Sequence, residues 1–390
     1  MEEGQIRSPS APAFTGHFQW LDIVKGLAIL WIVLFHCLQT YGGDLPQPIS
    51  FGSFFDFVRQ CAHGSAFGNF SCALVGVTAA VIQRGSQGVG VFILLSGFGL
   101  SYSHFRRGMF NDSWVVWYKR RLMRLFPIYW LAHLVFLVSP FAVLHDRVDY
   151  RFLLSFFGDR VYPVEEMFFY FVPAWWFVGL LIELYMVFPL LFVLMQRLGH
   201  VKYLAFCILS SVAARYILVS VVQANGYYEM GAFFVCRLWE FGAGMVLGKL
   251  MVEMPKVTLD RLLCLKGFLA GVILYALGVM AYQPNFLSSF SDGLMAMGLS
   301  VVLIHAAYRL NMAPSLGKPL AMAGVYSYGI YLFHQPYIMY ASEKLRSYDP
   351  GDFLVFAFAL TVFIALISMC LEYATNRSVD FFVGKASFRL

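Results

Sequence analysis

Charged residues are scarce in this sequence, and the scarcity limits what kind of protein it encodes. Asp, Glu, Lys and Arg make up 13% of the 390 residues, whereas a soluble domain carries about 25%. Hydrophobic residues account for 60% and aromatic residues for 18%. This composition excludes an ordinary soluble domain and predicts an all-α polytopic membrane protein.

Cysteine patterns typical of metal sites are also missing. The seven cysteines include no CxxC pair and no zinc-ligand spacing, so we expect no metal site. Cys61 and Cys72 share one loop, and they will pair if that loop faces an oxidising compartment. The other five are expected to be small core residues in or beside apolar segments: Cys37, Cys207, Cys236, Cys264 and Cys370.

Signals for nucleic-acid binding and for further domains are absent as well. The net charge is +6, but the basic residues cluster between apolar segments and therefore mark loops, not a nucleic-acid surface. We find no fixed-period repeat and no low-complexity tract, and we expect no cleaved signal peptide. The expected organisation is a disordered cytoplasmic leader at 1–19, a transmembrane domain at 20–376 and a cytoplasmic tail at 377–390.

The sequence does contain a series of apolar segments of about 20 residues, the length that crosses a membrane as a helix. Two further apolar stretches, 61–82 and 152–171, are interrupted by Gly, Pro or charge and are predicted to be re-entrant or interfacial. About ten transmembrane helices are predicted, at 20–42, 86–104, 125–144, 174–195, 202–222, 230–250, 264–282, 288–308, 321–341 and 353–374.

Basic residues in the loops predict the orientation of these helices. With a cytoplasmic N-terminus, the inside segments hold eighteen of the 28 Lys and Arg residues and the outside loops hold seven. Because cytoplasmic loops carry the excess of positive charge, both termini are predicted to be cytoplasmic. The longest outside loop, about 145–173, carries five acidic residues. It either covers an opening on that face or is simply a solvated loop.

The first predicted helix carries three ionisable residues in an apolar run. Asp22, Lys25 and His36 lie on one face, with Lys25 and His36 about 16 Å apart along the axis. Because charge is costly in a membrane, such a stripe is expected to face a polar cavity. We predict all three as catalytic, since an imidazole there can take a proton from a hydroxyl and a lysine can hold an anion. A histidine that merely packs is the alternative.

A basic run from Tyr118 to Trp130 leads into the third span. Arg121 and Arg124 are three residues apart and point the same way. They are either a positive-inside anchor or a clamp for phosphate oxygens, which guanidinium groups match well. Pro127 is predicted to start or kink the helix and to place Tyr129 and Trp130 at the membrane interface.

The second span is rich in glycine. Gly90, Gly97 and Gly99 predict a helix that other backbones, or a long thin ligand, approach closely. The glycine spacing does not match a dinucleotide-binding fingerprint. Ser96 has no GxSxG setting, so it is not predicted to be a nucleophile.

Later spans carry isolated polar groups. Glu183 lies about eight residues inside Trp175 and Trp176, which belong to an outer aromatic belt, and a carboxylate that deep has a partner or a function. Arg237 and Glu240 are three apart and are predicted to pair with each other. One helix face within 325–338 is polar and serves either interhelical hydrogen bonding or chemistry: Ser327, Tyr331, His334 and Gln335.

Taken in order, these motifs resemble the acyltransferase 3 family of integral-membrane acyltransferases, which includes O-antigen and exopolysaccharide acetylases. The resemblance runs from Trp20 to about Ile338. Where many members have LDxLRG in the first helix, this chain has LDIVKG, and lysine keeps the charge without a bidentate fork. The matching motifs are the basic residue–ten residues–histidine pattern of Lys25 and His36, LSGF at 95–98, the RxxR of Arg121 and Arg124, FPIYW at 126–130, the segment reaching Glu183, and SYGIYLFH at 327–334.

The resemblance implies an enzyme of the bacterial inner membrane that uses cytoplasmic acyl-CoA, with acetyl-CoA as the expected donor, and no metal. The acceptor would be a hydroxyl of a cell-surface or lipid-linked carbohydrate, and His36 would be essential. The implied cofactor-binding residues are Arg121, Arg124, Tyr129, Trp130, Ser96 and Gly97. The implied substrate-binding residues are Glu183, Trp176, Tyr331 and His334.

Two questions stay open at this point. His36 acts either as a general base for direct attack or as a nucleophile that forms an acyl-histidine. The non-enzymatic alternative is a transporter or flippase whose polar stripe lines a translocation path, and paired broken helices would favour it. A receptor or purely structural membrane protein explains the loop charges but not the ordered motifs.

Overall fold

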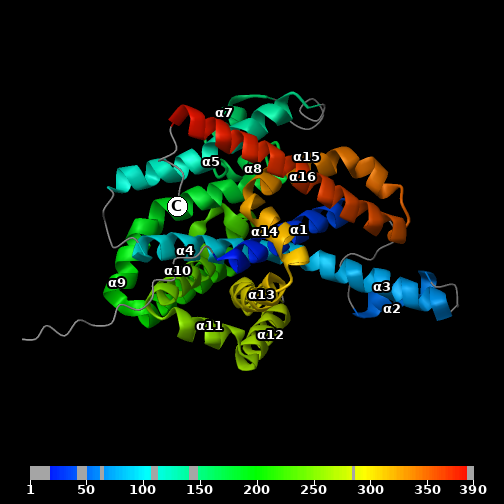
Figure 1. Ribbon diagram of the computed structural model, residues 1–390, viewed down its shortest axis with the longest axis horizontal. Coiled ribbons are helices and arrows are strands. Elements are labelled where there is room, and N and C mark those ends of the chain that lie inside the picture. Colours follow the sequence, from blue (N-terminus) through cyan, green and yellow to red (C-terminus); the bar gives the residue numbers. More distant parts are fainter. Residues whose placement is uncertain are drawn as a thin grey trace, which may run out of the picture.

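The structure is a computed structural model that describes residues 18–41, 51–61, 66–106, 113–139, 148–282 and 286–383. Every regular element in these ranges is helical, which confirms the predicted fold class (Figure 1). Most of the predicted leader, 1–17, and the end of the predicted tail, 384–390, lie outside the described residues, so the predicted domain limits are not tested.

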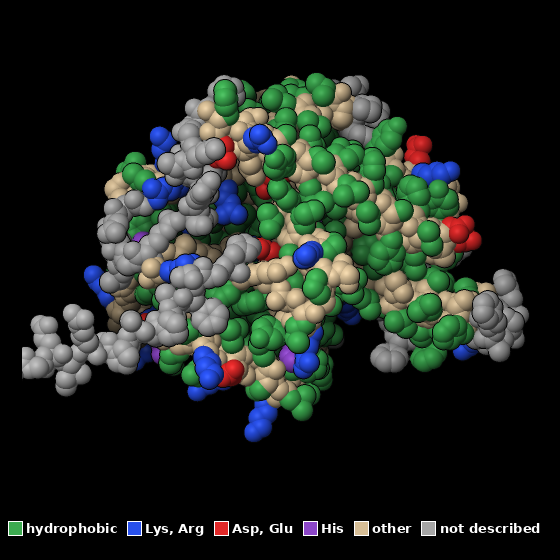
Figure 2. Space-filling model, viewed as in Figure 1, with side chains coloured by type: hydrophobic (Ala, Val, Ile, Leu, Met, Phe, Trp, Pro, Cys, Tyr) green, Lys and Arg blue, Asp and Glu red, His purple; other side chains and the backbone are tan. Residues whose placement is uncertain are grey.

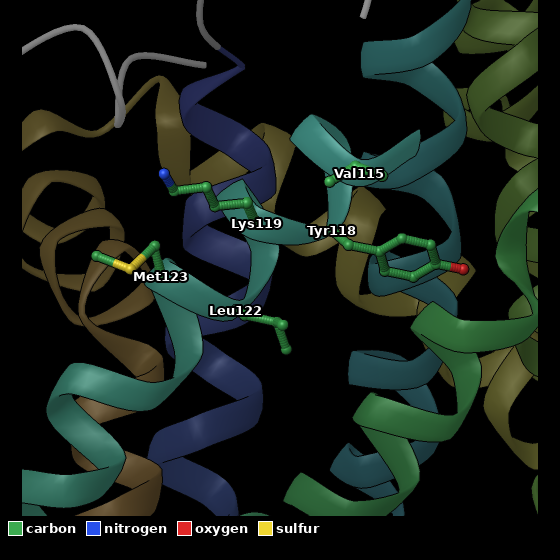
Figure 3. Close-up of a pocket in the computed structure, with 5 residues that line it drawn as sticks. All are labelled: Val115, Tyr118, Lys119, Leu122 and Met123. Atoms are coloured by element: carbon green, nitrogen blue, oxygen red, sulfur yellow. The ribbon is translucent and has the colours of Figure 1, made fainter. Parts of the chain in front are cut away.

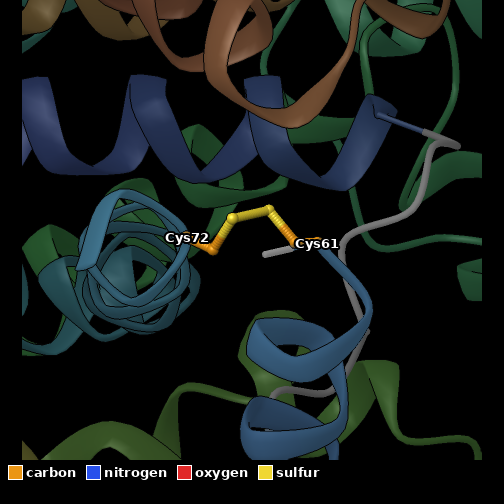
Figure 4. The surroundings of a disulfide bond; sticks show 2 residues. All are labelled: Cys61 and Cys72. Carbon is orange, nitrogen blue, oxygen red and sulfur yellow. A yellow bond between two sulfur atoms is a disulfide. The ribbon is translucent and has the colours of Figure 1, made fainter. Parts of the chain in front are cut away.

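The N-terminal elements include a pair of helices, α2 and α3, that projects from the bundle (Figure 1). These elements are α1 (Gln19–Thr40), α2 (Phe51–Cys61), α3 (Ala66–Gln83), η1 (Arg84–Gln87), α4 (Gly88–Arg106), α5 (Trp114–Leu137), α7 (Tyr150–Phe156), α8 (Val164–Met167) and η2 (Pro173–Trp175). Cys61 and Cys72 form a disulfide between α2 and α3, with their Cα atoms 6.0 Å apart (Figure 4).

The remaining elements complete the bundle. They are α9 (Trp176–Tyr216), η3 (Ile217–Val221), η4 (Tyr228–Ala232), η5 (Phe234–Arg237), α10 (Leu238–Glu253), α11 (Pro255–Leu263), α12 (Leu265–Ala281), α13 (Ser288–Asn311), α14 (Pro314–Val325), α15 (Ser327–Arg346) and α16 (Pro350–Val383). The most closely associated pairs are α4 with α10, α12 with α13, and α1 with α14. In the last pair, a side chain at Gly26 would collide with the Leu320 carbonyl, so glycine allows the two backbones to touch.

Several helices are long and apolar enough to cross a membrane. Among the described residues five stretches qualify, or six if the pair α11 and α12, bent by 65°, counts as one span. The five are Gln19–Thr40, Phe70–Arg106, Pro173–Val221, Ser288–Asn311 and Pro350–Phe381. The predicted total of ten spans therefore remains a prediction.

One of these stretches contains a helical hairpin. The backbone leaves the helical region inside α9 at Gly199, which has a φ of 72°. Glu183 before the break and Arg215 after it both bond to the same short segment, through the Phe234 amide and the Cys236 carbonyl. The two arms therefore fold back on each other and correspond to the predicted spans 174–195 and 202–222.

Three predicted spans have different boundaries in the structure. The third span belongs to α5, which begins at Trp114, so Pro127 lies inside the helix and does not start it. Span 230–250 is continuous α-helix only from Leu238, because two short helices precede it. Span 321–341 is interrupted at Tyr326, where α14 ends and α15 begins.

Contacts bring several helix ends together at the two ends of the bundle. At one end, Phe18 packs on Tyr102 and Lys249 lies over the ring of Phe105. At the other end, Arg346 Nε donates to the Thr40 carbonyl. Figure 2 shows a largely hydrophobic face with basic side chains mainly along its left and lower edges. Which end faces the cytoplasm remains a prediction.

The acidic residues of the long loop build the loop itself where it is described. Asp149 caps α7 through the Arg151 amide and pairs with the Arg151 guanidinium, which holds the pKa of the Asp149 carboxyl below its usual range. Asp159 Oδ1 accepts from the Val161 and Tyr162 amides. These bonds give the acidic side chains local structural roles.

Candidate active site

The second half of α1 places His36 against α15. The ring centroids of His36 and His334 are 5.0 Å apart, with an angle of 42° between the planes. His36 Nδ1 lies 3.1 Å from Gln39 Oε1, a contact that favours the tautomer with a hydrogen on Nδ1 and a lone pair on Nε2. The fold thus joins two imidazoles that lie far apart in the sequence.

His334 is fully buried, and its tautomer follows from its hydrogen bond. Its Nδ1 lies 2.6 Å from the Tyr331 carbonyl oxygen, which can only accept, so Nδ1 carries the hydrogen. Nε2 therefore holds a lone pair. Within the described part of the chain this atom is buried and has no hydrogen-bond partner. A buried acceptor without a donor costs about 1–3 kcal/mol, so this nitrogen suits a ligand that supplies the donor.

The middle of α15 is held by η2, directly before α9. The Tyr331 hydroxyl donates to the Ala174 carbonyl, and Trp175 Nε1 donates to the Leu332 carbonyl over 2.9 Å. Gln335 Oε1 accepts from the Ala174 amide. These bonds fix the helix turns on both sides of His334.

The first turn of α15 is held from two other helices. Glu372 Oε2 in α16 accepts from the Gly329 amide over 2.7 Å, which satisfies one of the free amides at the helix start. The Tyr328 hydroxyl donates to the Leu125 carbonyl in α5 over 3.3 Å. The arginine-bearing turn of α5 is therefore adjacent to the helix that carries His334.

Asp22 and Lys25 form a pair of their own near the start of α1. Lys25 Nζ lies 3.0 Å from Asp22 Oδ1, and the side chains are 32% and 6% exposed. Eleven residues of helix, about 16 Å, separate this ion pair from His36. The structure therefore places the three predicted catalytic residues of α1 at two separate locations.

The two arginines of α5 differ in their surroundings. Arg121 is half-buried, with Nη2 3.5 Å from Ser103 Oγ and its guanidinium 5.4 Å from the ring centre of Trp117. Arg124, one turn later, is exposed. Both are cationic groups on the same stretch of helix, within reach of a ligand at this end of the bundle.

Two grooves run along α5. One, of about 330 Å³, lies between α5 and the first arm of α9 and has Arg121 in its wall. Its other lining residues are Tyr118, Leu122, Phe126, Phe157, Ile182, Tyr185 and Met186. The second, of about 500 Å³, is an open surface lined by α5 alone, where Lys119 and Met123 extend away from Tyr118 (Figure 3). The first groove combines a cation with an apolar channel.

Tyr129 and Trp130 hold the last turn of α7. The buried Tyr129 hydroxyl donates to the Ser155 carbonyl over 3.0 Å, and Trp130 Nε1 donates to the Phe156 carbonyl over 2.9 Å. The Tyr129 ring is fully buried in the bundle, and the interface position of both residues remains a prediction.

The segment after α7 contains the buried guanidinium of Arg160. Arg160 donates to Ser155 Oγ over 2.7 Å and to the carbonyls of Tyr170 and Val172 over 2.7 and 3.1 Å. His133 Nε2 also lies 2.9 Å from Ser155 Oγ. This network ties the stretch 155–172 into the bundle, and the re-entrant or interfacial placement of 152–171 remains a prediction.

Comparison with known proteins identifies the family. The Acyltransferase domain model, Acyl_transf_3, matches residues 18–372, which is most of the chain. The chain belongs to the acyltransferase 3 family. It is also similar to the "Putative membrane-bound transacylase BcsY" of Komagataeibacter xylinus, with 25% identity over 318 residues, covering 76% of this chain and 78% of that protein. No solved structure matches the chain.

Membership of the acyltransferase 3 family settles the class of activity. The predicted transferase is confirmed at this level, and the transporter alternative loses its support. The apolar helices and the membrane-bound relative together support an integral, multi-pass membrane protein. The donor, the acceptor and the roles of individual residues are not decided by these comparisons.

In this acyltransferase, the glycine-rich face of helix α4 packs against helix α10. A side chain at Gly97 would collide with the Phe241 carbonyl, and one at Gly244 would collide with the Leu94 carbonyl, so α4 and α10 touch through their backbones. Ser96 Oγ donates to the Phe92 carbonyl within its own helix. The space beside Gly97 is thus filled by protein, and cofactor binding by Ser96 and Gly97 remains only a prediction.

The predicted acceptor residues of the first arm of α9 contact the segment before α10. Glu183 Oε2 accepts from the Phe234 amide over 3.2 Å, which supplies the partner that the sequence required. The Trp176 ring stacks on Phe168 at 5.5 Å and lies where a side chain at Gly231 would be. Neither residue contacts the histidine pair through a bond found here.

A cluster of five charges lies beyond this segment. Arg237 Nη1 bonds to Glu240 Oε1 over 3.1 Å, which confirms the predicted pair, and to Asp292 Oδ2 over 2.8 Å. Arg215 also binds Asp292, over 2.7 Å, and Glu229, over 3.1 Å. Asp292 therefore joins two arginines from different helices.

Sequence patterns did not identify three polar residues around the site. From the sequence, Arg160 is an ordinary charged residue of a loop, because no neighbouring residue indicates that this loop enters the bundle. His133 and Glu372 carry a weak signal, since each is an isolated ionisable residue in an apolar run. Their partners come from distant segments and become visible only in the fold.

Proposed function

We propose that this acyltransferase moves an acyl group, acetyl in the simplest case, from cytoplasmic acyl-CoA to a hydroxyl of a cell-surface or lipid-linked carbohydrate. His36 is the general base. The observation that carries the proposal is the pairing of His36 with His334 inside an apolar bundle. A pair of neutral imidazoles inside an acyltransferase suits the removal of a proton from a hydroxyl.

The donor binds at the end of the bundle that carries Arg121 and Arg124. Their guanidinium groups engage the phosphates of coenzyme A. The pantetheine arm follows the groove between α5 and α9, because that groove has Arg121 in its wall and is otherwise lined mainly by apolar side chains. This route replaces a path beside Gly97, where α10 fills the space.

Lys25 acts at the donor end and not at the reacting carbonyl. The ion pair with Asp22 keeps its ammonium group near the start of α1, about 16 Å along the helix from His36. A group at that distance cannot donate to an oxyanion formed beside His36. Lys25 instead supplies a further cation for the anionic part of acyl-CoA.

The chemical step is a direct transfer. His36 Nε2 takes the proton from the acceptor hydroxyl while its oxygen forms a bond to the thioester carbon. The bond between that carbon and sulfur then breaks, and the thiolate recovers the proton from the imidazolium as coenzyme A leaves. The acceptor enters from the opposite end, where Trp176 and Glu183 are proposed to contact the sugar. Tyr331 contributes by holding α15, since its hydroxyl is bonded to Ala174.

The decisive experiment supplies the purified protein in liposomes with acetyl-CoA labelled in the acetyl group and with saccharide acceptors. Label on the saccharide supports the proposal, and its absence with every acceptor contradicts it. Mass spectrometry of the surface polysaccharide from cells with and without the protein provides the second readout, as a mass difference of one acyl group. Label that stays on the protein in the absence of acceptor, and is lost in a His36→Ala variant, would indicate an acyl-histidine instead.

A further inference from the structure

We infer that the acceptor is a vicinal diol: His36 takes the proton of one hydroxyl, and His334 Nε2 accepts a hydrogen bond from the hydroxyl on the neighbouring carbon. The inference rests on the proposed function and adds the chemical class of its acceptor. It distinguishes a sugar-ring diol from an isolated alcohol.

The first observation is the state of His334. Its Nδ1 donates to the Tyr331 carbonyl, so Nε2 is an acceptor, and this buried atom has no partner within the described ranges. The hydroxyl one turn away, on Tyr331, is already donated to Ala174. The described residues supply no donor for Nε2, which leaves it available to a ligand hydroxyl, because a buried acceptor is costly when it stays unsatisfied.

The second observation is the distance between the two imidazoles. Their ring centroids are 5.0 Å apart, and the contact of His36 Nδ1 with Gln39 leaves an acceptor on that ring as well. The site therefore offers two acceptor nitrogens in one small volume. A lone hydroxyl has a single hydrogen and can satisfy only one of them. Two hydroxyls on adjacent carbons supply two donors side by side, which matches the pair.

Binding of the second hydroxyl orients the acceptor, and it changes neither the bonds nor the protons of the proposed reaction. The hydroxyl bound to His334 keeps its proton throughout. The only proton that moves is the one that His36 takes and the leaving thiolate recovers. Binding the second hydroxyl limits rotation of the acceptor and directs the reacting oxygen toward the thioester carbon.

The test combines substrate and protein variants in one cycle. Methyl glycosides of glucose, galactose, mannose and rhamnose are first compared as acceptors for labelled acetyl groups with the unaltered protein. The acylated position of the best acceptor is then mapped, and analogues lacking the hydroxyl on each adjacent carbon are assayed. One of these analogues should react with a kcat/KM about tenfold to a hundredfold lower, because His334 Nε2 is left without its donor.

Variants of His334 assign that loss to the imidazole. In His334→Ala the parent glycoside and its critical deoxy analogue should react at rates within about threefold of each other. His334→Asn, which offers an oxygen acceptor, should restore part of the preference. Equal rates of the unaltered protein with the parent and every adjacent deoxy analogue would overturn the inference while leaving the proposed function intact, as would an undiminished preference in His334→Ala. Failure to label any glycoside would remove the carbohydrate acceptor itself.

Discussion

Lys25 and His36 share one helix, yet they have different neighbours. Lys25 pairs with Asp22 at the start of α1, whereas His36 lies on His334 from α15. In an apolar bundle an ionisable side chain needs a partner or a ligand, so these neighbours indicate what each residue does. The ion pair provides a held cation, and the imidazole pair provides proton acceptors.

The arginines of α5 allow a test at the level of single side chains. Replacing Arg121 with Ala should raise the KM for acyl-CoA about tenfold to a hundredfold with a smaller effect on kcat, since a hydrogen bond to a charged group contributes about 1.5–3 kcal/mol. Arg124→Ala should act in the same direction. Initial rates at varied acyl-CoA concentration measure both constants.

Matched variants make the arginine test specific. Arg121→Lys should recover part of the affinity, because lysine keeps the charge but not the bidentate fork. Arg197→Ala removes an exposed cation from the hairpin of α9 and should leave KM unchanged. An unchanged KM for Arg121→Ala, or an equal rise for Arg197→Ala, would contradict the assignment of the donor site.

Some residue contacts followed from the sequence and others did not. The Arg237–Glu240 pair was predictable, because residues three apart in a helix are neighbours on its surface. The meeting of His36 and His334 was not, since periodicity within a helix says nothing about the contact between two helices. Arg160 was counted as a loop charge, because its burial depends on a loop that folds inward.

Near the site, side chains from several other elements hold α15. Glu372 satisfies its first turn, Tyr328 bonds to α5, and η2 holds its middle through Tyr331 and Trp175. Because these bonds hold the two turns that precede His334, its position depends on partners in three other elements. The donor-side turn of α5 is one of them.

Removing the Glu372 carboxylate should weaken the start of α15. In Glu372→Ala the Gly329 amide loses its acceptor, which should cost about 1–3 kcal/mol and lower both the unfolding temperature and the activity. Glu372→Gln keeps an oxygen at that position and should retain most of both. Glu343→Ala, an exposed change on the same helix, should alter neither. Thermal unfolding in detergent and transfer assays provide the comparison, and a Glu372→Ala protein as stable and active as Glu343→Ala would contradict this role.

The sequence predicted the presence of helices better than their boundaries. All ten predicted segments contain helix, because long apolar runs leave a membrane chain few other ways to satisfy its backbone. The break at Tyr326 was not evident, since the apolar run continues through it. The break at Gly199 was anticipated, because charged residues around the glycine interrupt the run.

For the molecule as a whole, the proposed function requires one end of the bundle to bind the donor and the other to bind the acceptor. Phe18, Tyr102 and Lys249 mark one end, and Thr40 and Arg346 mark the other. We predict that the first end is cytoplasmic, because the Lys and Arg excess lies there. His36 then lies nearer the outer end of α1, between a donor below and an acceptor above.

Cysteine labelling tests this orientation. Cys264 is an exposed free thiol between α11 and α12, on the predicted inside. A membrane-impermeant maleimide should label it in lysed cells but not in intact cells. Cys61 and Cys72 should be labelled in intact cells only after an impermeant reductant opens their disulfide, since the pair lies on the predicted oxidising side. Labelling of Cys264 in intact cells would reverse the orientation.

If His36 performs the proton transfer of this acyltransferase, its replacement should remove activity from a protein that still folds. Transfer of labelled acetyl groups to saccharide should be followed with the unaltered protein and with His36→Ala in liposomes, after unfolding curves show that both are folded. We expect His36→Ala to lose at least about a hundredfold in kcat, within the range expected for a general base. Substantial transfer by a folded His36→Ala protein would contradict it.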